Sequence, residues 1–347
     1  MTKHLLSHDL PDSIATEEEL EELLSRPTPW LSDLLGQVEG DIAVLGVGGK
    51  VGPSLARMAK RAAPYKRVLG VARFSEEGLR DELETAGIET IVCDLLDRDA
   101  VAALPDVANV IYMAGKKFGT DGDPSFSWAM NTHVPSLVAE RYRAARIVAF
   151  STLCVYPFAP FVGGGWSEDV QPGPTGDYAT SCVGRERVFS YFSRKYQTPG
   201  RLIRLNYAID MRYGVLHDIA RWVLDGKPIP IGTAFASVIW QGDSNAQILG
   251  ALAHATTPTT PLNVGGPEHA SVLMIAEEFG RRFGKTPVIE GEPAASGWYN
   301  NTLAAQRLYG YPTVPLARMI DWVADWVGRG MPSLDKPTHY EERAGHF

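Results

Sequence analysis

The sequence has 347 residues, 45% hydrophobic and 21% charged, which is the composition of a globular protein able to bury a sizeable core. A net charge of −8 without any basic run argues against nucleic acid as a partner, because phosphate binding needs clustered lysine and arginine. Three cysteines, eight scattered histidines and no long apolar run give no sign of a disulfide framework, a metal site, a membrane span or an export signal, so we expect a cytoplasmic protein.

Residues 1–40 are predicted to form a helical leader in front of the main body. Thr16 is a candidate N-cap followed by glutamates, and Leu20, Leu23 and Leu24 give an apolar stripe at helical spacing. Two prolines then interrupt the pattern before a second short helix. We expect the leader to pack on the body or on a neighbouring subunit, with a bound partner as the less favoured alternative.

Between residues 41 and 206 short apolar runs alternate with segments of helical period. The runs are apolar on both faces and end in glycine or small polar residues, as buried parallel strands do. Strands of this kind, alternating with helices, predict a doubly wound parallel sheet covered on both sides, a Rossmann-like α/β fold. The six predicted strands are residues 41–46, 67–72, 89–93, 109–115, 146–151 and 201–206.

Residues 207–330 lose this regular alternation. A helix and a proline-rich strand are followed by a short strand at 262–266 and by two amphipathic helices, 271–284 and 315–330. We expect a smaller C-terminal region, interleaved with the Rossmann domain, that caps the cleft where the strands end and binds the substrate. Residues 331–347 are polar and have no core pattern, which predicts a C-terminal tail.

A glycine-rich segment links the first predicted strand to the helix that follows it. Glycine lets the backbone turn sharply off the strand and approach a pyrophosphate, and the free N–H groups of a helix N-terminus attract negative charge. At the first strand–helix turn of an alternating chain this pattern predicts a dinucleotide site, with a turn used only for close packing as the weaker alternative. The loop residues expected to contact the cofactor are Gly46, Gly48, Gly49, Lys50, Val51 and Gly52.

The residue that follows the second predicted strand bears on which dinucleotide is bound. An acidic residue there would accept hydrogen bonds from a ribose 2′-OH, whereas an arginine suits a 2′-phosphate. The strand ends at Ala72 and is followed by Arg73. This favours NADP over NAD, although Arg73 stacked on adenine or free in solvent is an alternative.

With these features the chain resembles the extended short-chain dehydrogenase/reductase family, the NAD(P)-dependent sugar-nucleotide epimerases and dehydratases, over about residues 41–330. The resemblance implies a homodimer. It also implies further cofactor contacts after the third and fourth strands and on the next helix, namely Asp94, Leu95, Ala114, Gly115, Lys117 and Asn131.

Two segments resemble the catalytic motifs of that family. FSTLCVYP, residues 150–157, resembles a strand-end motif in which a hydroxyl group bonds the reacting oxygen, and its register places Thr152 in that role. GDYATSC, residues 176–182, resembles the family's Tyr-x-x-x-Lys helix motif. The resemblance implies that Tyr178 exchanges a proton with the substrate oxygen and contacts the cofactor, whereas Cys182 stands where the family has lysine.

The missing lysine leaves three interpretations open. Since a free phenol has a pKa of about 10, a nearby cation is the usual means of ionising it, and cysteine provides none. In the first interpretation Arg185 or Lys117 replaces the lysine, or a neutral Tyr178 acts as the acid in a reduction. In the second, Cys182 itself is an acid, base or nucleophile. In the third, the protein is a catalytically impaired sensor or scaffold that binds a dinucleotide.

The first interpretation is favoured because Thr152 and Tyr178 are both present. It predicts an NAD(P)-dependent oxidoreductase or epimerase acting on a hydroxyl or ketone of a sugar-like or other small carbonyl substrate. Binding the diphosphate of a nucleotide-sugar would need a clear basic patch, whereas the basic residues of the C-terminal region are isolated. A free sugar is therefore expected as a substrate as much as a nucleotide-sugar. The candidate substrate residues mix hydrogen-bonding groups with an aromatic platform, and packing of a loop is their equal alternative: Asn206, Tyr207, Asp210, Arg212 and Trp240.

Overall fold

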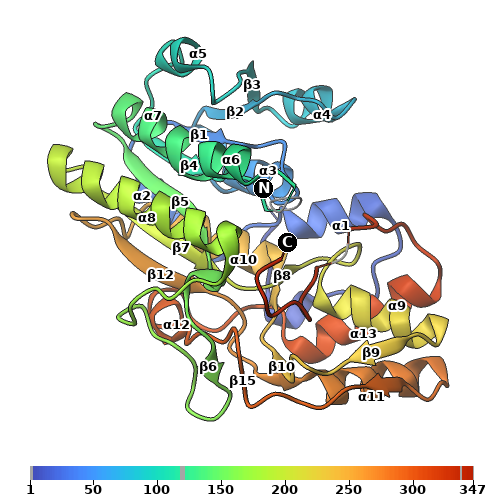
Figure 1. Ribbon diagram of the computed structural model, residues 1–347. Coiled ribbons are helices and arrows are strands. Elements are labelled where there is room, and N and C mark those ends of the chain that lie inside the picture. Colours follow the sequence, from blue (N-terminus) through green and yellow to red (C-terminus); the bar gives the residue numbers. More distant parts are fainter. Residues whose placement is uncertain (1–2, 118–121, 337, 347) are drawn as a thin grey trace.

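A seven-stranded parallel sheet organises the chain (Figure 1). The computed structural model describes residues 3–117, 122–336 and 338–346. The chain enters the sheet at β1, and the strand order reverses between β1 and its neighbour β4, where doubly wound folds bind their ligands. In spatial order the strands are β12 (Thr260–Val264), β7 (Gly200–Leu205), β5 (Arg146–Thr152), β4 (Asn109–Tyr112), β1 (Ile42–Leu45), β2 (Val68–Ala72) and β3 (Glu89–Val92). The predicted Rossmann-like fold is confirmed.

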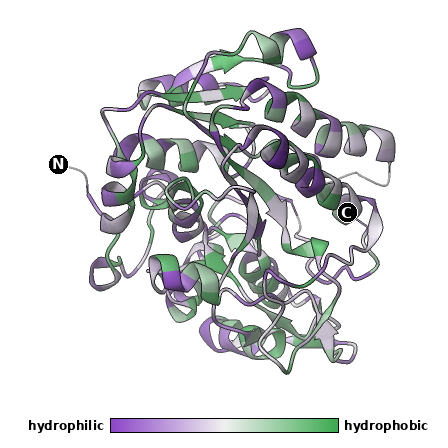
Figure 2. Cartoon of the chain, turned by 90° about the vertical axis from the view of Figure 1, so that its left-hand side faces the viewer, coloured by the Kyte–Doolittle hydropathy of each residue, from purple (hydrophilic) through white to green (hydrophobic). Residues whose placement is uncertain are grey.

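Helices cover both faces of this sheet, and side chains of each strand alternate between the two faces. They are α2 (Pro29–Gln37), α3 (Gly52–Ala62), α4 (Leu79–Thr85), α5 (Arg98–Ala102), α6 (Pro124–Trp128), α7 (Val134–Arg141), α8 (Gly176–Tyr196), α10 (Gln241–Gly250) and α12 (Leu303–Tyr309). Ala43 and Leu45 of β1 face a core shared with α5, α7 and α8. Ile42 and Val44 face a core shared with α2, α3 and α10. Hydrophobic residues accordingly gather on the sheet and on the inner sides of the helices (Figure 2).

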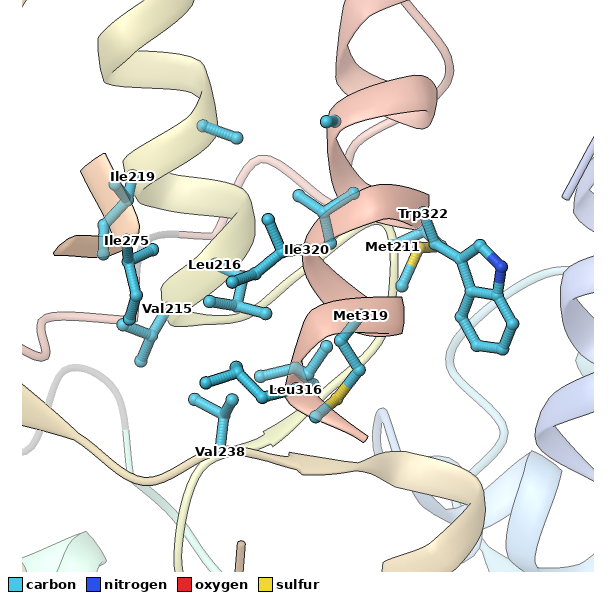
Figure 3. Close-up of a cluster of buried hydrophobic side chains, with 14 of the residues drawn as sticks. Met211, Val215, Leu216, Ile219, Val238, Ile275, Leu316, Met319, Ile320 and Trp322 are labelled. Carbon is cyan, nitrogen blue, oxygen red and sulfur yellow. The ribbon is translucent and has the colours of Figure 1, made fainter. Parts of the chain in front are cut away.

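A second lobe lies beyond the carboxyl ends of the strands. Its helices are α1 (Glu17–Leu24), α9 (Val215–Asp225), α11 (Val272–Phe283) and α13 (Leu316–Gly328). Leu216 and Ile219 of α9 pack with Ile320 of α13 and Ile275 of α11 in one buried cluster (Figure 3). Helix α1 adds its apolar stripe, including the fully buried Leu24, to the same cluster. The first part of the leader therefore belongs to this lobe's core, whereas its second helix, α2, packs on the sheet.

Four pairs of short strands brace the second lobe. They are β6 (Ala159–Pro160) with β15 (Ser296–Gly297), β8 (Ala208–Ile209) with β11 (Ile239–Trp240), β9 (Pro228–Pro230) with β14 (Val288–Glu290), and β10 (Phe235–Ala236) with β13 (Ala270–Ser271). Each pair joins segments that are distant in sequence. Loops near the strand ends are thereby held in place.

The C-terminal segment, residues 331–336 and 338–346, packs between the two lobes (dark red in Figure 1). Tyr340 is 1% exposed and contacts the ring of Trp222, with 5.9 Å between ring centroids. The backbone N–H and the hydroxyl of Thr338 donate to Asp218 of α9 at 2.9 and 2.6 Å. The polar segment predicted as a C-terminal tail is therefore packed against the body, and polar groups such as those of Thr338 are hydrogen-bonded to it.

Within the described ranges, no helix is long and apolar enough to cross a bilayer. The same residues contain no cluster of three histidine, cysteine or acidic side chains placed to hold a metal ion.

Candidate functional site

The glycine-rich loop between β1 and α3 lies against the end of β4. Gly46 has φ +91°, and a Cβ atom there would lie 2.7 Å from the backbone nitrogen of Ala114. A Cβ on Gly52 would collide with the Val47 carbonyl. Gly49 would meet nothing closer than 3.6 Å and is exposed. Two of the glycines are thus needed for close packing, and Gly49 leaves the loop open to a ligand at the N-terminus of α3.

A cavity of about 220 Å³ lies on one side of the loop. Arg73 and Asp94 line it, one after β2 and the other after β3. Asp94 accepts a hydrogen bond from the Leu96 backbone at 3.0 Å, and Arg73 is exposed with no hydrogen bond or ion pair to another described residue. Glu76 lines the same cavity. Its other lining residues include Gly46, Gly48, Gly49, Leu95, Ala114 and Gly115, so most residues expected to contact the cofactor do meet here.

The leader forms one wall of a larger cavity, about 950 Å³, on the other side of the loop. Gly48, Gly49 and Lys50 line it opposite glutamates of α1. Arg212 also lines it and pairs with Glu17 and Glu21 of α1 at 3.2 and 2.6 Å.

A third cavity, about 280 Å³, opens at the carboxyl ends of β5 and β7 and is called the reaction cavity below. It brings the expected catalytic pair, Thr152 and Tyr178, together with residues of the glycine loop. Its other lining residues include Lys50, Val51, Gly115, Lys117, Ser151, Cys154, Arg185, Tyr207, Tyr213 and Thr338.

The Tyr178 hydroxyl is hydrogen-bonded to Thr152, the last residue of β5. Burial raises the pKa of Tyr178 well above its usual value, and the sulfurs of Cys182 and Cys154 raise it further. The Arg185 charge and the Thr152 hydrogen bond oppose this rise in pKa. Without a bound ligand Tyr178 is therefore a neutral phenol at pH 7.

Cys182 is fully buried and packs against Val155 and Tyr156. Burial raises the pKa of its thiol to about 11, so it is uncharged at neutral pH. This environment suits a small apolar side chain better than an acid, base or nucleophile.

Two lysines reach into the reaction cavity from different loops. The Lys50 ammonium lies 4.1 Å from the ring centroid of Tyr213 and 3.4 Å from the Ala208 carbonyl. Burial lowers the pKa of Lys50 to about 8. Lys117 donates to the Thr338 carbonyl at 3.4 Å, and burial lowers its pKa as well. Lys50 thus contacts the loops of the C-terminal lobe, whereas Lys117 contacts the C-terminal segment and also interacts electrostatically with Cys154 and Cys182.

Asn131, expected to contact the cofactor, is instead fully engaged inside the protein. It lies in a single π-helical turn (Ala129–His133) and is 0% exposed. Its side-chain nitrogen donates to the Lys116 carbonyl and to Ser181, both at 2.9 Å. Its oxygen accepts from the Lys116 backbone at 3.0 Å and from Arg185 at 2.6 Å. With four partners, Asn131 has no group left for a ligand.

Of the five residues expected to bind substrate, Tyr207 alone is among those lining the reaction cavity. Asn206 is fully buried and donates to Asn300 at 3.0 Å. Asp210 is 1% exposed and accepts from the Arg212 backbone at 2.6 Å, while the Arg212 side chain faces α1. These three side chains do not line the reaction cavity, and each has a hydrogen bond or ion pair to another part of the protein.

Trp240, the expected aromatic platform, is also wrong as a cavity residue. It is 0% exposed and contacts Trp322 of α13, with 5.4 Å between ring centroids. The apolar core of the C-terminal lobe surrounds it.

Sequence reasoning missed a buried polar network beneath the cavity. Arg204 pairs with Glu186 at 2.8 Å and donates to the Tyr156 hydroxyl at 2.7 Å. Ser151 donates to Glu186 at 2.7 Å, and Tyr156 donates to Asn263 at 2.9 Å. The network joins β5, α8, β7 and β12. The residues in the sequence that could have indicated this network are Glu186, on the helix that resembles the family's Tyr-x-x-x-Lys helix, and Arg204 in the next strand. Thr338, also missed, had no local signal.

Comparison with known proteins agrees with this architecture. The model of the NAD dependent epimerase/dehydratase family matches residues 42–223. A solved UDP-glucuronic acid 4-epimerase from Bacillus cereus, in complex with UDP-glucuronic acid and NAD, is 22% identical with a TM-score of 0.69, over 83% of this chain and 99% of that one. The UDP-glucose 4-epimerase of Thermus thermophilus, complexed with NAD, is 19% identical with a TM-score of 0.68, over 82% and 98%. That of Thermotoga maritima, with UDP-glucose, is 16% identical with a TM-score of 0.68, over 84% and 99%. No curated protein sequence matches the chain significantly.

Proposed function

The chain belongs to the NAD dependent epimerase/dehydratase family, and on that premise we propose that it is an epimerase-type oxidoreductase acting on a hydroxyl or ketone of a sugar-like substrate. The observation that carries this proposal is the pairing of Tyr178 with Thr152 in a cavity that Lys50 and Val51 of the glycine-rich loop also line. A hydroxyl pair beside a dinucleotide loop is the minimum arrangement for moving a proton at a carbon that is oxidised or reduced.

The proton chemistry falls to Tyr178. When the substrate carbonyl is reduced, neutral Tyr178 donates its phenolic proton to the carbonyl oxygen, which Thr152 holds by a hydrogen bond. When the alcohol is oxidised, the phenolate takes the proton of the hydroxyl group. A bound dinucleotide would accept the hydride that leaves the carbon in the oxidation, or donate the hydride that joins the carbon in the reduction.

The residues around the glycine loop fit a nicotinamide dinucleotide. Gly46 allows the close approach to β4, Gly49 leaves the N-terminus of α3 accessible, and the cavity lined by Arg73 and Asp94 suits an adenosine. NAD is the leading candidate because the Bacillus cereus and Thermus thermophilus epimerases hold it. Glu76 beside Arg73 also disfavours a 2′-phosphate. The NADP preference expected from Arg73 stays a prediction to be tested against NAD.

The substrate is proposed to be a small sugar-like molecule. The reaction cavity is about 280 Å³, at the lower end of the range for ligand sites, and the C-terminal segment contributes Thr338 to its wall. The arginine pair of α11 does not face it, since Arg282 pairs with Asp321 and both arginines pair with Glu278. These features favour a single ring over the nucleotide-sugars held by the solved epimerases. A homodimer and a cytoplasmic location stay predictions, the first to be tested by light scattering.

The test begins with fluorescence titration of NADH and NADPH, followed by a turnover screen of sugars, sugar acids and UDP-sugars. Tyr178→Phe should lower turnover about a thousandfold while NADH affinity changes by less than about threefold, because the phenylalanine keeps the ring and loses the proton. Tyr191→Phe is the matched control, since Tyr191 is an exposed tyrosine of the same helix.

Unchanged turnover in Tyr178→Phe would contradict the proposed role of the tyrosine. Tight NADH binding without turnover of any compound would favour the alternative of a dinucleotide-binding sensor or scaffold.

A further inference from the structure

The position of the family lysine on α8 is occupied by Cys182, but a cation lies one turn further along the same helix. Arg185 is 5% exposed, and its guanidinium lines the reaction cavity together with Tyr178. Tyr178 and Arg185 are seven positions apart on one helix, which places them on the same face two turns apart.

The guanidinium of Arg185 is held by two other elements. Nη2 donates to Oδ1 of Asn131 at 2.6 Å, and Nη1 donates to the Phe150 carbonyl of β5 at 2.9 Å. Nε lies 3.4 Å from the Asn131 carbonyl. The other three hydrogen bonds of the Asn131 side chain, to Lys116 and Ser181, fix that acceptor in turn. Arg185 therefore has a defined position rather than the freedom of a surface side chain.

Arg185 still has donors available toward the cavity. A guanidinium carries five N–H groups, of which these contacts use three, leaving one on each terminal nitrogen. The glycine at position 115 is what admits the group, because a Cβ there would collide with Nη2. Gly115 also lines the cavity assigned to the adenosine half of the cofactor. The guanidinium thus lies against Gly115, after the end of β4, in the cavity that Tyr178 also lines.

The groups that face Tyr178 determine how the positive charge of Arg185 affects the ionisation of the phenol. Cys182 comes from its own helix, Cys154 from the turn after β5, and Thr152 from the strand end. Both sulfurs raise the pKa of Tyr178, whereas Arg185 is the cation that lowers it. Arg185 itself faces Tyr112 of β4, Cys182, Tyr178 and Glu186. Lys117, the other candidate, donates to the Thr338 carbonyl on the C-terminal segment and also interacts electrostatically with Cys154 and Cys182.

We propose that Arg185, held by Asn131 and admitted by Gly115, replaces the absent motif lysine as the positive charge that positions the bound dinucleotide and favours ionised Tyr178. This inference rests on the proposed function, and it names the residue on which that function depends after the loss of the lysine. An arginine does not lose its proton in the working pH range, so it stabilises charge without relaying protons. Arg185 is accordingly a positioning residue.

The test is a charge swap with four proteins: wild type, Arg185→Met, Cys182→Lys and the double variant. Arg185→Met should weaken NADH binding about tenfold and lower turnover about a hundredfold. Cys182→Lys alone should also lower NADH affinity and turnover, because it places a second cation beside Arg185 in a buried site. The double variant carries one cation again, so compared with Arg185→Met it should bind NADH about tenfold more tightly and turn over about tenfold faster. Arg187→Met, an exposed arginine two residues away, is the matched control and should change neither quantity.

A pH profile separates this role from a structural one. Arg185→Lys should retain activity at neutral pH but lose turnover on the alkaline side, because a buried lysine deprotonates where arginine does not. Wild type should show no such alkaline loss from its cation. A residue that only packs would give parallel profiles.

Two results would overturn the proposal: wild-type NADH affinity in Arg185→Met, or a double variant that is folded by circular dichroism yet no better than Arg185→Met in both measurements. If no compound is turned over by wild type, the proposed function fails by itself. The NADH affinities of the four proteins then still decide whether Arg185 positions the dinucleotide.

Discussion

The two sides of the reaction cavity are built in different ways. The cofactor side consists of the glycine loop and the ends of β4 and β5, all edges of one parallel sheet. The substrate side combines Tyr207, Tyr213 and Thr338, which belong to loops and to the C-terminal segment. In a parallel sheet the carboxyl ends of successive strands meet at one edge, so short local motifs determine where their side chains lie. On the substrate side the positions depend on packing between segments that are distant in sequence.

The largest expected effect tests the rigid cofactor side. Gly46→Ala should lower the free energy of unfolding by about 3 kcal/mol, because alanine is strained at φ +91° and its Cβ would lie 2.7 Å from the Ala114 nitrogen. NADH binding should be lost with it. Thermal unfolding and fluorescence titration measure the two effects.

Gly49→Ala is the matched control for this prediction. Its Cβ would meet only the Gly46 carbonyl at 3.6 Å, so stability should change by less than about 0.5 kcal/mol. NADH affinity should nevertheless fall about tenfold if the loop approaches the pyrophosphate. A stable Gly46→Ala protein with normal NADH affinity would show that the loop does not pack closely against Ala114 at the end of β4.

The outcome of the sequence predictions follows the same division. All six strands of the alternating region and the glycine loop were predicted from local patterns, and Thr152 and Tyr178 do meet. The sequence identified the anomaly at Cys182, yet it left Arg185 and Lys117 as equal candidates for its replacement. Helical spacing alone did not reveal that Asn131 and Gly115 make a site for the guanidinium, because these residues come from other elements.

On the substrate side, local pattern failed for physical reasons. A polar side chain after a strand looks the same in sequence whether it faces a ligand or a protein partner, and Asn206 and Arg212 both face protein partners. The C-terminal segment is not a helix or strand with a regular apolar face: it is held by the buried ring of Tyr340 and by hydrogen bonds such as those of Thr338 to Asp218, which leave no periodic pattern in the sequence. Only the assembled structure shows it beside the cavity.

A smaller effect distinguishes core from cavity among the aromatic residues of the substrate side. Trp240→Phe should lower the free energy of unfolding by about 2 kcal/mol, because the smaller ring leaves a void against Trp322, and should leave the KM of the substrate unchanged. Tyr207→Phe should instead change the KM of the substrate and leave stability nearly unchanged. The Tyr207 hydroxyl has no hydrogen bond to another described residue and its ring lines the cavity, so KM should rise severalfold at nearly constant stability.

Thermal unfolding and steady-state kinetics of both variants give the answer. A raised KM in Trp240→Phe would return that residue to the substrate site and contradict its assignment to the core.

The smallest expected effect concerns Lys50, where the two sides of the cavity meet. Burial lowers its pKa from 10.5 to about 8, so between these values the unfolded chain binds a proton that the folded protein has released. The stability of wild type therefore rises with pH across this window relative to a variant without the charge. A pKa shift of this size corresponds to about 3 kcal/mol, but Lys50 is only half-buried and solvent screens its charge, so Lys50→Met should be more stable than wild type by about 1 kcal/mol at pH 7. The difference should shrink toward zero as pH approaches 10.5.

Denaturant unfolding of both proteins from pH 7 to 10 measures this difference, with the exposed Lys227→Met as a control whose difference stays constant with pH. A constant difference for Lys50→Met as well would mean that Lys50 is solvated rather than buried. A difference that shrinks as expected would show that the chain keeps a lysine which destabilises its own fold at neutral pH. Because the Lys50 ammonium lies against the Ala208 carbonyl and the Tyr213 ring, this destabilisation is located where the cofactor loop meets the substrate loops.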